Sequence, residues 1–268
     1  MTASISGARS ELGRILARQR GAGTKGNIHV NVAGQQANTL LHDGHAWKDF
    51  SRTALTGTRR ALRSALEVDA SMLVHASFAF VHAVERGTDL AEPLRSCVDA
   101  IRECEALVLA GPVPACVVRM GYLYGPESAD LRAYRTAFRL GRPYWSGPAK
   151  ALQYHLHQFD AVRALLAAAR PRNEGAILYA TDGHAVSFTK FMDAFAHRVG
   201  RRTPLHLPLF SKPLAKAIVR EEHMQQAALA MPHRVPTPRV PGWAPKFPDY
   251  RQGLDQVIAD WAGRADDE

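Results

Sequence analysis

The apolar run 115–118 and the residues that follow it limit the possible folds of the chain more than any other stretch. The run is short and rich in β-branched side chains, which predicts a buried strand. Gly125-Pro126 ends the pattern, because glycine frees the backbone and proline lacks a donor. The strand would carry Arg119, Tyr122 and Tyr124 to the carboxyl edge of a sheet. Open α/β sheets bind ligands at that edge, so we expect an α/β fold with its site there.

The same stretch resembles a known signature. Residues 119–126 are similar to the R-P-G-x-x-Y-G-P motif of the extended short-chain dehydrogenase/reductases, also called NAD-dependent epimerases/dehydratases, with departures at Met120 and Tyr122. Further matches are 53–62 to N-x-x-G-T-x-x-L-L, 154–166 to F-I-H-V-D-D-V-A-R-A-L-L, and 242–254 to the closing G-W-x-P and R-E-G-L segments. The resemblance covers residues 3–20, 27–130 and 141–262.

The resemblance implies a reduced Rossmann-type, mostly parallel sheet with helices on both faces, and a small, mainly helical C-terminal substrate domain. Residues 1–125 would form the Rossmann-type core, which lacks the second and third strands and is completed by parts of 152–182. Residues 126–268 would form the substrate-type lobe and the closing segment.

A glycine turn follows the first predicted strand. Gly7, Ser10 and Gly13 resemble the family's Gly-x-x-Gly-x-x-Gly dinucleotide turn with its middle glycine replaced. Glycine lets the backbone approach a diphosphate, and the next helix offers free N–H groups at its N-terminus. The Cβ of Ser10 narrows that approach. Asn31 and Ala33 are the other cofactor positions that the resemblance implies.

The adenosine end of a dinucleotide site is missing from the sequence. Such folds place an acidic residue about 20 positions past the glycines to hold the ribose. Here the turn-rich segment 21–26 leads straight to 28–34, which resembles the family's later strand. NAD(P) is therefore implied by family resemblance only, and we expect its binding to be weak or absent.

The family's catalytic side chains are also missing. The Ser position falls on Phe78, and Ser77 falls on the preceding, mainly structural serine. The Tyr and Lys positions fall on Cys97 and Ile101 of a helix predicted over 92–109. That pair works because the Lys ammonium lowers the pKa of the Tyr phenol. Cys and Ile cannot replace it.

Several other polar residues could serve a cleft. Candidate catalytic residues are His75, Ser77, His82, Tyr124 and His157, and candidate substrate-binding residues are Arg119, Tyr122 and Tyr124. Histidine titrates near neutrality and could act as an acid or base, but a packed, hydrogen-bonded histidine is the alternative at each place. Aromatic core packing accounts equally for the two tyrosines. His155 and His157 share one face of a predicted strand, yet no third metal ligand is evident, so no metal site is predicted.

Charge and composition limit the partners. The net charge of +9 favours an anionic ligand, but the arginines are scattered and argue against nucleic acid. No apolar run of membrane-spanning length occurs, and the three cysteines suit a reducing, cytoplasmic location. We expect a small-molecule partner, which could be anionic. A homodimer is also possible, because relatives often pair through the Tyr–Lys helix, where Ala100, Cys104 and Leu107 could supply part of a face.

Three functions remain open. The first is an atypical family member that has lost hydride transfer and binds, or acts without redox chemistry on, a small polar ligand between the lobes. The second is a working NAD(P)-dependent epimerase or reductase with unusual catalytic residues. The third is a non-enzymatic scaffold or regulatory subunit. The missing strands and catalytic side chains place the second below the other two.

Overall fold

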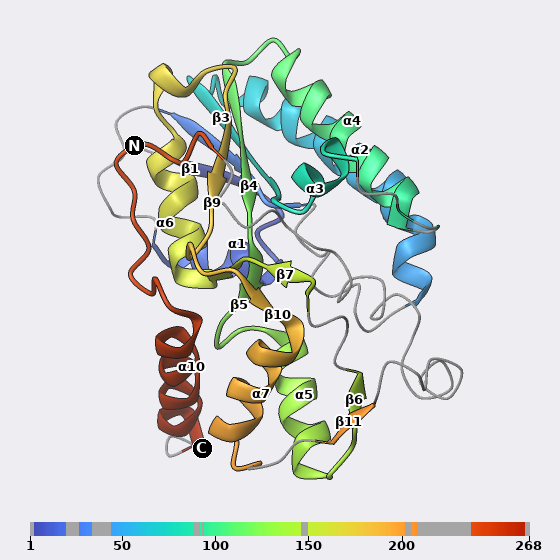
Figure 1. The fold of residues 1–268 in the computed structure, drawn as a ribbon. Coiled ribbons are helices and arrows are strands. Elements are labelled where there is room, and N and C mark those ends of the chain that lie inside the picture. Colours follow the sequence, from blue (N-terminus) through green and yellow to red (C-terminus); the bar gives the residue numbers. More distant parts are fainter. Residues whose placement is uncertain are drawn as a thin grey trace.

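The computed structural model describes residues 3–19, 27–33, 44–87, 90, 92, 94–145, 150–201, 205–207 and 237–265. Its centre is a five-stranded parallel sheet in the order β1-β2-β3-β4-β9 (Figure 1). The strands are β1 (Ala3–Ser6), β2 (Ile28–Asn31), β3 (Met72–Phe78), β4 (Ala115–Met120) and β9 (Ile177–Ala180). Helices cover both faces, so the expected reduced Rossmann-type fold is confirmed.

The order of the strands shows how this sheet is reduced. In the six-stranded order 3-2-1-4-5-6 the first strand is central. Here β1 pairs with β2, Ser6 opposite Asn31, and has no second neighbour among the described strands. Only residues 19–27 connect the first helix to β2. A crossover between parallel strands needs a dozen or more residues, so this connection is too short for two more strands and their helix.

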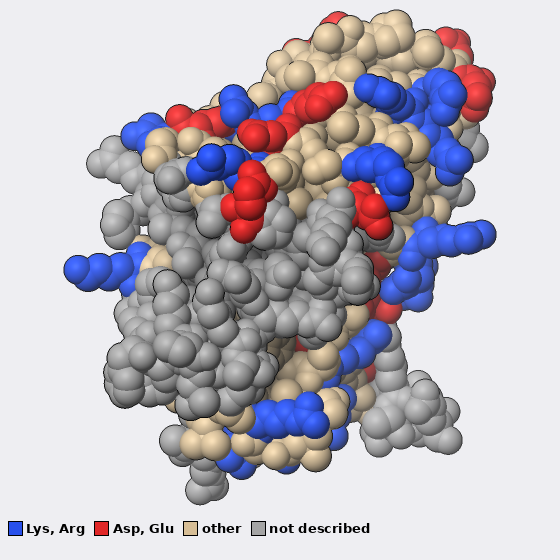
Figure 2. Space-filling view, turned by 90° about the vertical axis from the view of Figure 1, so that its right-hand side faces the viewer, with Lys and Arg blue, Asp and Glu red and all other residues tan. Residues whose placement is uncertain are grey.

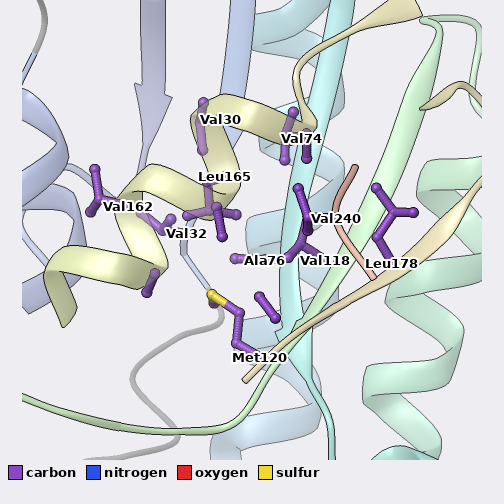
Figure 3. Packing of buried hydrophobic residues seen from close by; sticks show 14 of the residues in the cluster. Val30, Val32, Val74, Ala76, Val118, Met120, Val162, Leu165, Leu178 and Val240 are labelled. Atoms are coloured by element: carbon purple, nitrogen blue, oxygen red, sulfur yellow. The ribbon is translucent and has the colours of Figure 1, made fainter. Parts of the chain in front are cut away.

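One face of the sheet is apolar and packs on α1 (Glu11–Arg18) and α6 (Gln158–Ala168). Figure 3 shows Val30, Val74 and Val118 of three neighbouring strands pointing toward Leu165 of α6. All four of these side chains are fully buried. Burying each contributes about 1.5–3 kcal/mol, so this layer is the main hydrophobic core.

The other face carries polar side chains and packs on α2 (Gly44–Glu67) and α4 (Leu94–Leu109). Residues of parallel strands that lie opposite one another share a face, as Ser77, Arg119 and Tyr179 do here. The polar residues of this face are Ser4, Ser6, His29, Asn31, His75, Ser77, Arg119 and Tyr179. Such groups stay buried only if they are hydrogen-bonded, as His29 is to Ser4 and Ser6, and Asn31 to His75.

The second lobe is mainly helical. It contains α5 (Ala129–Arg139), α7 (Phe188–Arg198) and α10 (Tyr250–Ala265), which share one aromatic-rich core. The structure also has three separate two-stranded ladders: β5 (Tyr122–Tyr124) with β8 (His155–His157), β7 (Leu152–Gln153) with β10 (Val186–Ser187), and β6 (Tyr144–Trp145) with β11 (His206–Leu207). The remaining described elements are α3 (Val81–Glu85) and η2 (Pro171–Asn173). Where one lobe ends in the chain stays a prediction.

The closing segment is fixed to both lobes. Pro238 and Val240 bond to the backbone of Tyr179, so the segment lies along the outer edge of β9. Asp160, in the first turn of α6, accepts hydrogen bonds from Lys246 N at 2.8 Å and Phe247 N at 2.9 Å. A buried carboxylate therefore anchors the chain just before α10.

Some details differ from expectation. The helix expected over 92–109 begins at Leu94, and Val186–Ser187 form a strand rather than the first turn of α7. Segments 21–26 and 232–236 lie outside the described residues. Of the residues that could supply part of a dimer face, Ala100 and Cys104 are buried within the chain and Leu107 is half-buried, and the homodimer stays a prediction. The outer surface over α2 and α4 instead shows basic and acidic side chains together (Figure 2). No helix among the described residues could span a membrane.

The fold predicts opposite effects for two glycines of α10. A Cβ at Gly253 would lie 2.0 Å from the Tyr124 hydroxyl oxygen, whereas a Cβ at Gly263 meets nothing within 4 Å. Gly253→Ala should lower the free energy of unfolding by about 1–3 kcal/mol through overpacking. Gly263→Ala should raise it by about 0.5–1 kcal/mol, because alanine has the higher helix propensity. Urea unfolding of both variants measures this, and a Gly253→Ala protein as stable as wild type would contradict the packing described.

Candidate functional site

The carboxyl ends of β3, β4 and β9 meet at one edge of the sheet, beside the second lobe. A cavity of about 10 Å³ opens there, lined by Phe78, Ala79, Phe80, Met120, Gly121, Tyr122 and Tyr154. It has room for about one water molecule. We call Tyr122, Tyr124, Tyr154, His155 and Asp182 the interlobe site, because they surround this edge from β5, β8 and the turn after β9.

The three positions of the family's Ser, Tyr and Lys come together, but as apolar packing. Phe78, Cys97 and Ile101 belong to one hydrophobic cluster and are 7%, 2% and 4% exposed. Burial raises the pKa of the Cys97 thiol to about 12, so it stays protonated at neutral pH. A second cavity of about 10 Å³ lies beside this cluster, between Phe78 and Thr58. None of the three side chains can pass a proton at neutral pH.

Arg119 ends β4 as predicted, but it is the centre of an ion-pair cluster. Its Nε and Nη2 donate to the Glu105 carboxylate at 2.9 and 2.6 Å, and its Nη1 and Nη2 donate to Glu85 at 2.7 and 2.6 Å. Nη1 also donates to the Tyr179 hydroxyl at 2.9 Å. All five N–H groups of the guanidinium have protein acceptors. Substrate binding by Arg119 stays a prediction, and this geometry does not favour it.

Ser77 and His82 extend the same cluster. Ser77 Oγ donates to Glu105 Oε1 at 2.5 Å. His82 Nδ1 lies 3.2 Å from the Tyr179 hydroxyl and 3.9 Å from Glu85. Both candidate catalytic residues therefore contact the partners of Arg119, not its guanidinium.

His75 and Asn31 form a separate buried pair. Asn31 Nδ2 donates to His75 Nδ1 at 2.9 Å, and Asn31 Oδ1 accepts from Ala33 N at 3.1 Å. Burial lowers the pKa of His75 to about 4, so its imidazole is neutral. His29 bonds in a similar way to Ser4 and Ser6, at 2.7 and 2.9 Å. These contacts join β1, β2 and β3 through their side chains.

His157 and Tyr124 lie together under the second lobe. His157 caps α6, where its Nδ1 accepts from Phe159 N at 3.2 Å, and burial lowers its pKa to about 4. The Tyr124 ring lies 5.3 Å from the His157 ring and 5.4 Å from the Phe191 ring. Burial raises the pKa of the Tyr124 phenol far above its ordinary value. Tyr122 lines the cavity, and its ring stacks on Phe80.

The glycine turn keeps its backbone shape. Gly7 has φ +83°, and a Cβ there would lie 2.7 Å from Ala33 N. A Cβ at Gly13 would lie 2.2 Å from Gly7 O. Ser10 caps α1, because its Oγ accepts from Gly13 N at 3.0 Å. One N–H group of the first turn is thus bonded by the chain itself.

Glu11 places a carboxyl group in the first turn of α1. It accepts hydrogen bonds from Ala129 N at 2.9 Å and Gln158 Nε2 at 2.8 Å, and burial raises its pKa. It therefore joins the glycine turn to the N-termini of α5 and α6. A carboxylate so near this helix end disfavours a diphosphate, which would use the same positive end of the dipole. β1 lies at the edge of the described sheet, and weak or absent binding of a dinucleotide stays a prediction.

Asp182 is the residue that the sequence analysis missed. It lies in the turn after β9 and is 4% exposed. Its Oδ1 accepts from His184 N at 3.0 Å, and its Oδ2 has no hydrogen-bond partner in the described part of the chain. Burial, with a smaller effect of Asp249, raises the pKa of its carboxyl to about 8. The sequence signal that could have identified Asp182 is its position, because it is an acidic residue shortly after a strand, at the carboxyl edge of the sheet.

The fold and its sheet edge define a class of protein. The chain has the α/β fold of the extended short-chain dehydrogenase/reductases, the NAD-dependent epimerase/dehydratase type. The resemblance found in the sequence is thus confirmed at the level of the fold. No model of a known protein family matches the chain.

Particular proteins share this fold. The chain resembles a 3-diazoavenalumate denitrifying reductase from a Streptomyces species, with 29% identity over 231 residues, which are 80% of this chain and 75% of that protein. The human epimerase family protein SDR39U1, solved with NADPH, has a TM-score of 0.72 at 16% identity over 97% of this chain and 100% of its own. RMD from Pseudomonas aeruginosa, also with NADPH, has a TM-score of 0.68 at 16% identity, covering 98% and 99%.

The buried histidines predict acid sensitivity. Burial lowers the pKa of His29, His75 and His157 to about 4 and that of His155 to about 3. The unfolded chain binds protons at these positions from about pH 6.5 downward, before the folded chain does. Their stabilisation is therefore complete above about pH 6.5 and lost as the pH falls toward 4, on the order of 1–3 kcal/mol each. Urea unfolding between pH 7.5 and 5 should show this slope, and His75→Gln should reduce it. A flat profile would contradict the burial described.

The ion-pair cluster predicts a structural role for Arg119. Arg119→Met should lower the free energy of unfolding by about 3–5 kcal/mol, because the Glu105 carboxylate stays buried without its partner. Combining it with Glu105→Gln should cost less than the sum of the two single changes. Urea unfolding of the three variants gives the coupling. If the Arg119→Met protein were as stable as wild type, the fold would not need the guanidinium of Arg119, and that group would be available to a ligand in the unaltered protein.

Proposed function

We propose that this protein has lost Tyr–Lys-dependent hydride transfer and binds a small polar ligand in the interlobe site, where any turnover uses acid–base chemistry without a redox step. The observation that carries the proposal is the hydrophobic cluster of Phe78, Cys97 and Ile101. General acid catalysis needs a group that titrates near the working pH, and this cluster offers none. Asp182, whose pKa is raised to about 8, is such a group.

The cofactor turn supports the same proposal. Ser10 bonds the helix N-terminus, and the Glu11 carboxyl lies in its first turn. A bound dinucleotide would have no described strand beyond β1 to hold its adenosine, and its diphosphate would lie near the Glu11 carboxyl. The glycines at 7 and 13 are explained by close packing, since a Cβ at either would approach backbone atoms within 3 Å.

A second candidate function is reduction, and the Streptomyces relative favours it. The name of that relative describes a reductase that removes nitrogen from a diazo compound. Dinitrogen leaves without being protonated, so such a reaction does not require a tyrosine acid. A chain without the Tyr–Lys pair could therefore still belong to a reductase of this kind, provided that it holds a nicotinamide cofactor.

Dinucleotide binding separates the two candidates. We expect calorimetry with NADH and NADPH to show no binding at micromolar Kd, which corresponds to about −8 kcal/mol. Ser10→Gly combined with Glu11→Gln should strengthen binding of inorganic pyrophosphate, since it removes the cap and the charge, while NADPH stays weak. Micromolar NADPH affinity in the unaltered protein would reject the first candidate.

Turnover tests the second candidate directly. An aryl diazonium carboxylate is incubated with NADPH and the protein, and nitrogen release and NADPH consumption are followed together. We expect no rate above that of denatured protein. A protein-dependent rate that survives Cys97→Ser would establish reduction without the family's catalytic residues and would make the second candidate the function.

A further inference from the structure

The two edges of the parallel sheet differ in how the chain covers them. At the β9 edge the closing segment pairs with the strand, because Tyr179 N donates to Pro238 O at 2.9 Å and Val240 N donates to Tyr179 O at 3.2 Å. At the opposite edge β1 has only β2 as a neighbour among the described strands. An uncovered edge presents backbone N–H and C=O groups with which another strand can pair.

β1 is held in register and lacks the usual features that protect an edge strand. His29 of β2 bonds both serines of β1, with its Nδ1 at 2.7 Å from Ser4 Oγ and its Nε2 at 2.9 Å from Ser6 Oγ. Proteins protect edge strands with charged side chains, proline or a bulge. The sequence of β1, Ala-Ser-Ile-Ser, has no charge and no proline, and its one-to-one pairing with β2 leaves no bulge. The strand is therefore an ordered template for a further strand.

Two residues of β1 direct their backbone groups outward. Val32 N donates to Ser6 O at 2.9 Å, so the backbone of Ser6 faces β2. In an extended strand the N–H and C=O of one residue point to the same side, and this side alternates along the strand. The backbone of Ser4 therefore also faces β2, whereas the backbone of Ala3 and of Ile5 faces away from it. These are the groups that a further strand would bind.

The segments of this chain that lie outside the described residues are poor candidates for the cover of β1. Segment 20–26 reads Arg-Gly-Ala-Gly-Thr-Lys-Gly, and glycine disfavours a strand. Segment 34–43 joins β2 to α2, and it has too few residues to pass around β1, run along it and return. Segment 208–236 leads from β11 to the closing segment, which lies at the β9 edge. A second copy of this chain, in contrast, brings a strand that is complementary to β1.

We propose that two copies of this chain pair through β1, antiparallel about a two-fold axis at Ser4, and so join their five-stranded sheets. This goes beyond the proposed function, because it assigns a partner surface and does not involve the interlobe site. In an antiparallel pair, opposite residues exchange both backbone hydrogen bonds. With the axis at Ser4, Ala3 of each copy lies opposite Ile5 of the other. All outward N–H and C=O groups of the two residues are then paired.

The side chains of β1 fit this self-pairing. Because Ser4 and Ser6 lie on the polar face of the sheet, Ala3 and Ile5 lie on the apolar face. Ile5 packs at the margin of the main hydrophobic core and is only half-buried, as is Ile15 of α1 on the same face. Pairing places Ala3 of the second copy beside Ile5 and extends the apolar layer across the axis. A two-fold contact uses one patch twice, so the uncharged strand meets no like charge and both edges are covered at once.

Sedimentation of the purified protein over a range of concentrations tests the interface, with two changes at Ala3. Ala3→Pro removes an outward N–H, and proline is tolerated at the first residue of a strand. We expect the unaltered protein to dimerise and Ala3→Pro to raise the dissociation constant at least about tenfold, because each Ala3–Ile5 pair loses a hydrogen bond. The matched control, Ala3→Val, keeps the N–H and should stay dimeric. Urea unfolding of dilute, monomeric protein checks that Ala3→Pro is folded.

Amide hydrogen exchange locates the contact without any substitution. The Ile5 amide faces outward, so it should exchange slowly in concentrated protein and faster on dilution, with the same midpoint as dimer dissociation. The Ser6 amide faces β2 and should be protected at every concentration. The two amides lie next to each other in the chain, so their difference reports pairing at the outer edge rather than unfolding of β1.

Other outcomes overturn the interface. A monomer at every concentration with a rapidly exchanging Ile5 amide shows that β1 binds no second copy. A monomer in which this amide is always protected shows that a segment of the same chain covers β1. A dimer that Ala3→Pro leaves unchanged, with an Ile5 amide that exchanges rapidly, pairs through another surface, such as that of α4.

Discussion

The structure depends on pairing the buried charge and the buried polar groups of the sheet face that lies under α2 and α4. Parallel sheets are buried on both faces and usually carry apolar residues on each. Here Arg119 lies on this face, and bidentate pairing with Glu105 of α4 joins strand to helix. Glu85 of α3 completes the neutralisation. Breaking such a buried pair costs far more than its net contribution, so the positions of α3 and α4 are specified by these contacts. The edge to which Phe78 and Asp182 belong is built on that arrangement.

Sequence reasoning succeeded where a local pattern determines the result. The run before Arg119 predicted β4, and the motif alignment brought Phe78, Cys97 and Ile101 together, as they are in the hydrophobic cluster. The short segment between the glycine turn and residues 28–34 predicted that two strands are missing, and β1 indeed pairs directly with β2. Periodicity and chain length carry these inferences, because strand order in such folds follows from which segments are present.

It failed where the partner of a residue comes from a distant part of the chain. Arg119 was expected to face a ligand, but residues 85 and 105 supply the carboxylates that surround it. Two interpretations of the histidines were left open, an acid or base and a packed side chain. Burial among several elements lowers the pKa of His75 and His157 to about 4, which favours the packed side chain. Asp182 was not considered in the sequence analysis. Its raised pKa depends on segments before and after it that no local pattern connects.

The positions of the family's Ser, Tyr and Lys carry apolar packing in this chain, whereas a carboxyl group with a raised pKa lies in the turn after β9. The first turn of α1 and the cluster around Cys97 became closed by a cap, a carboxyl group and apolar packing. The turn after β9, in contrast, holds Asp182, whose carboxyl has a pKa raised to about 8. Nearby, the Tyr124 hydroxyl and His155 Nδ1 have no hydrogen-bond partner among the described residues, and each such buried atom destabilises the folded chain. Selection for stability alone would remove these groups first. These unpaired polar groups therefore support the proposal that binding in this protein takes place near the turn after β9, beside the second lobe, rather than at the helix α4.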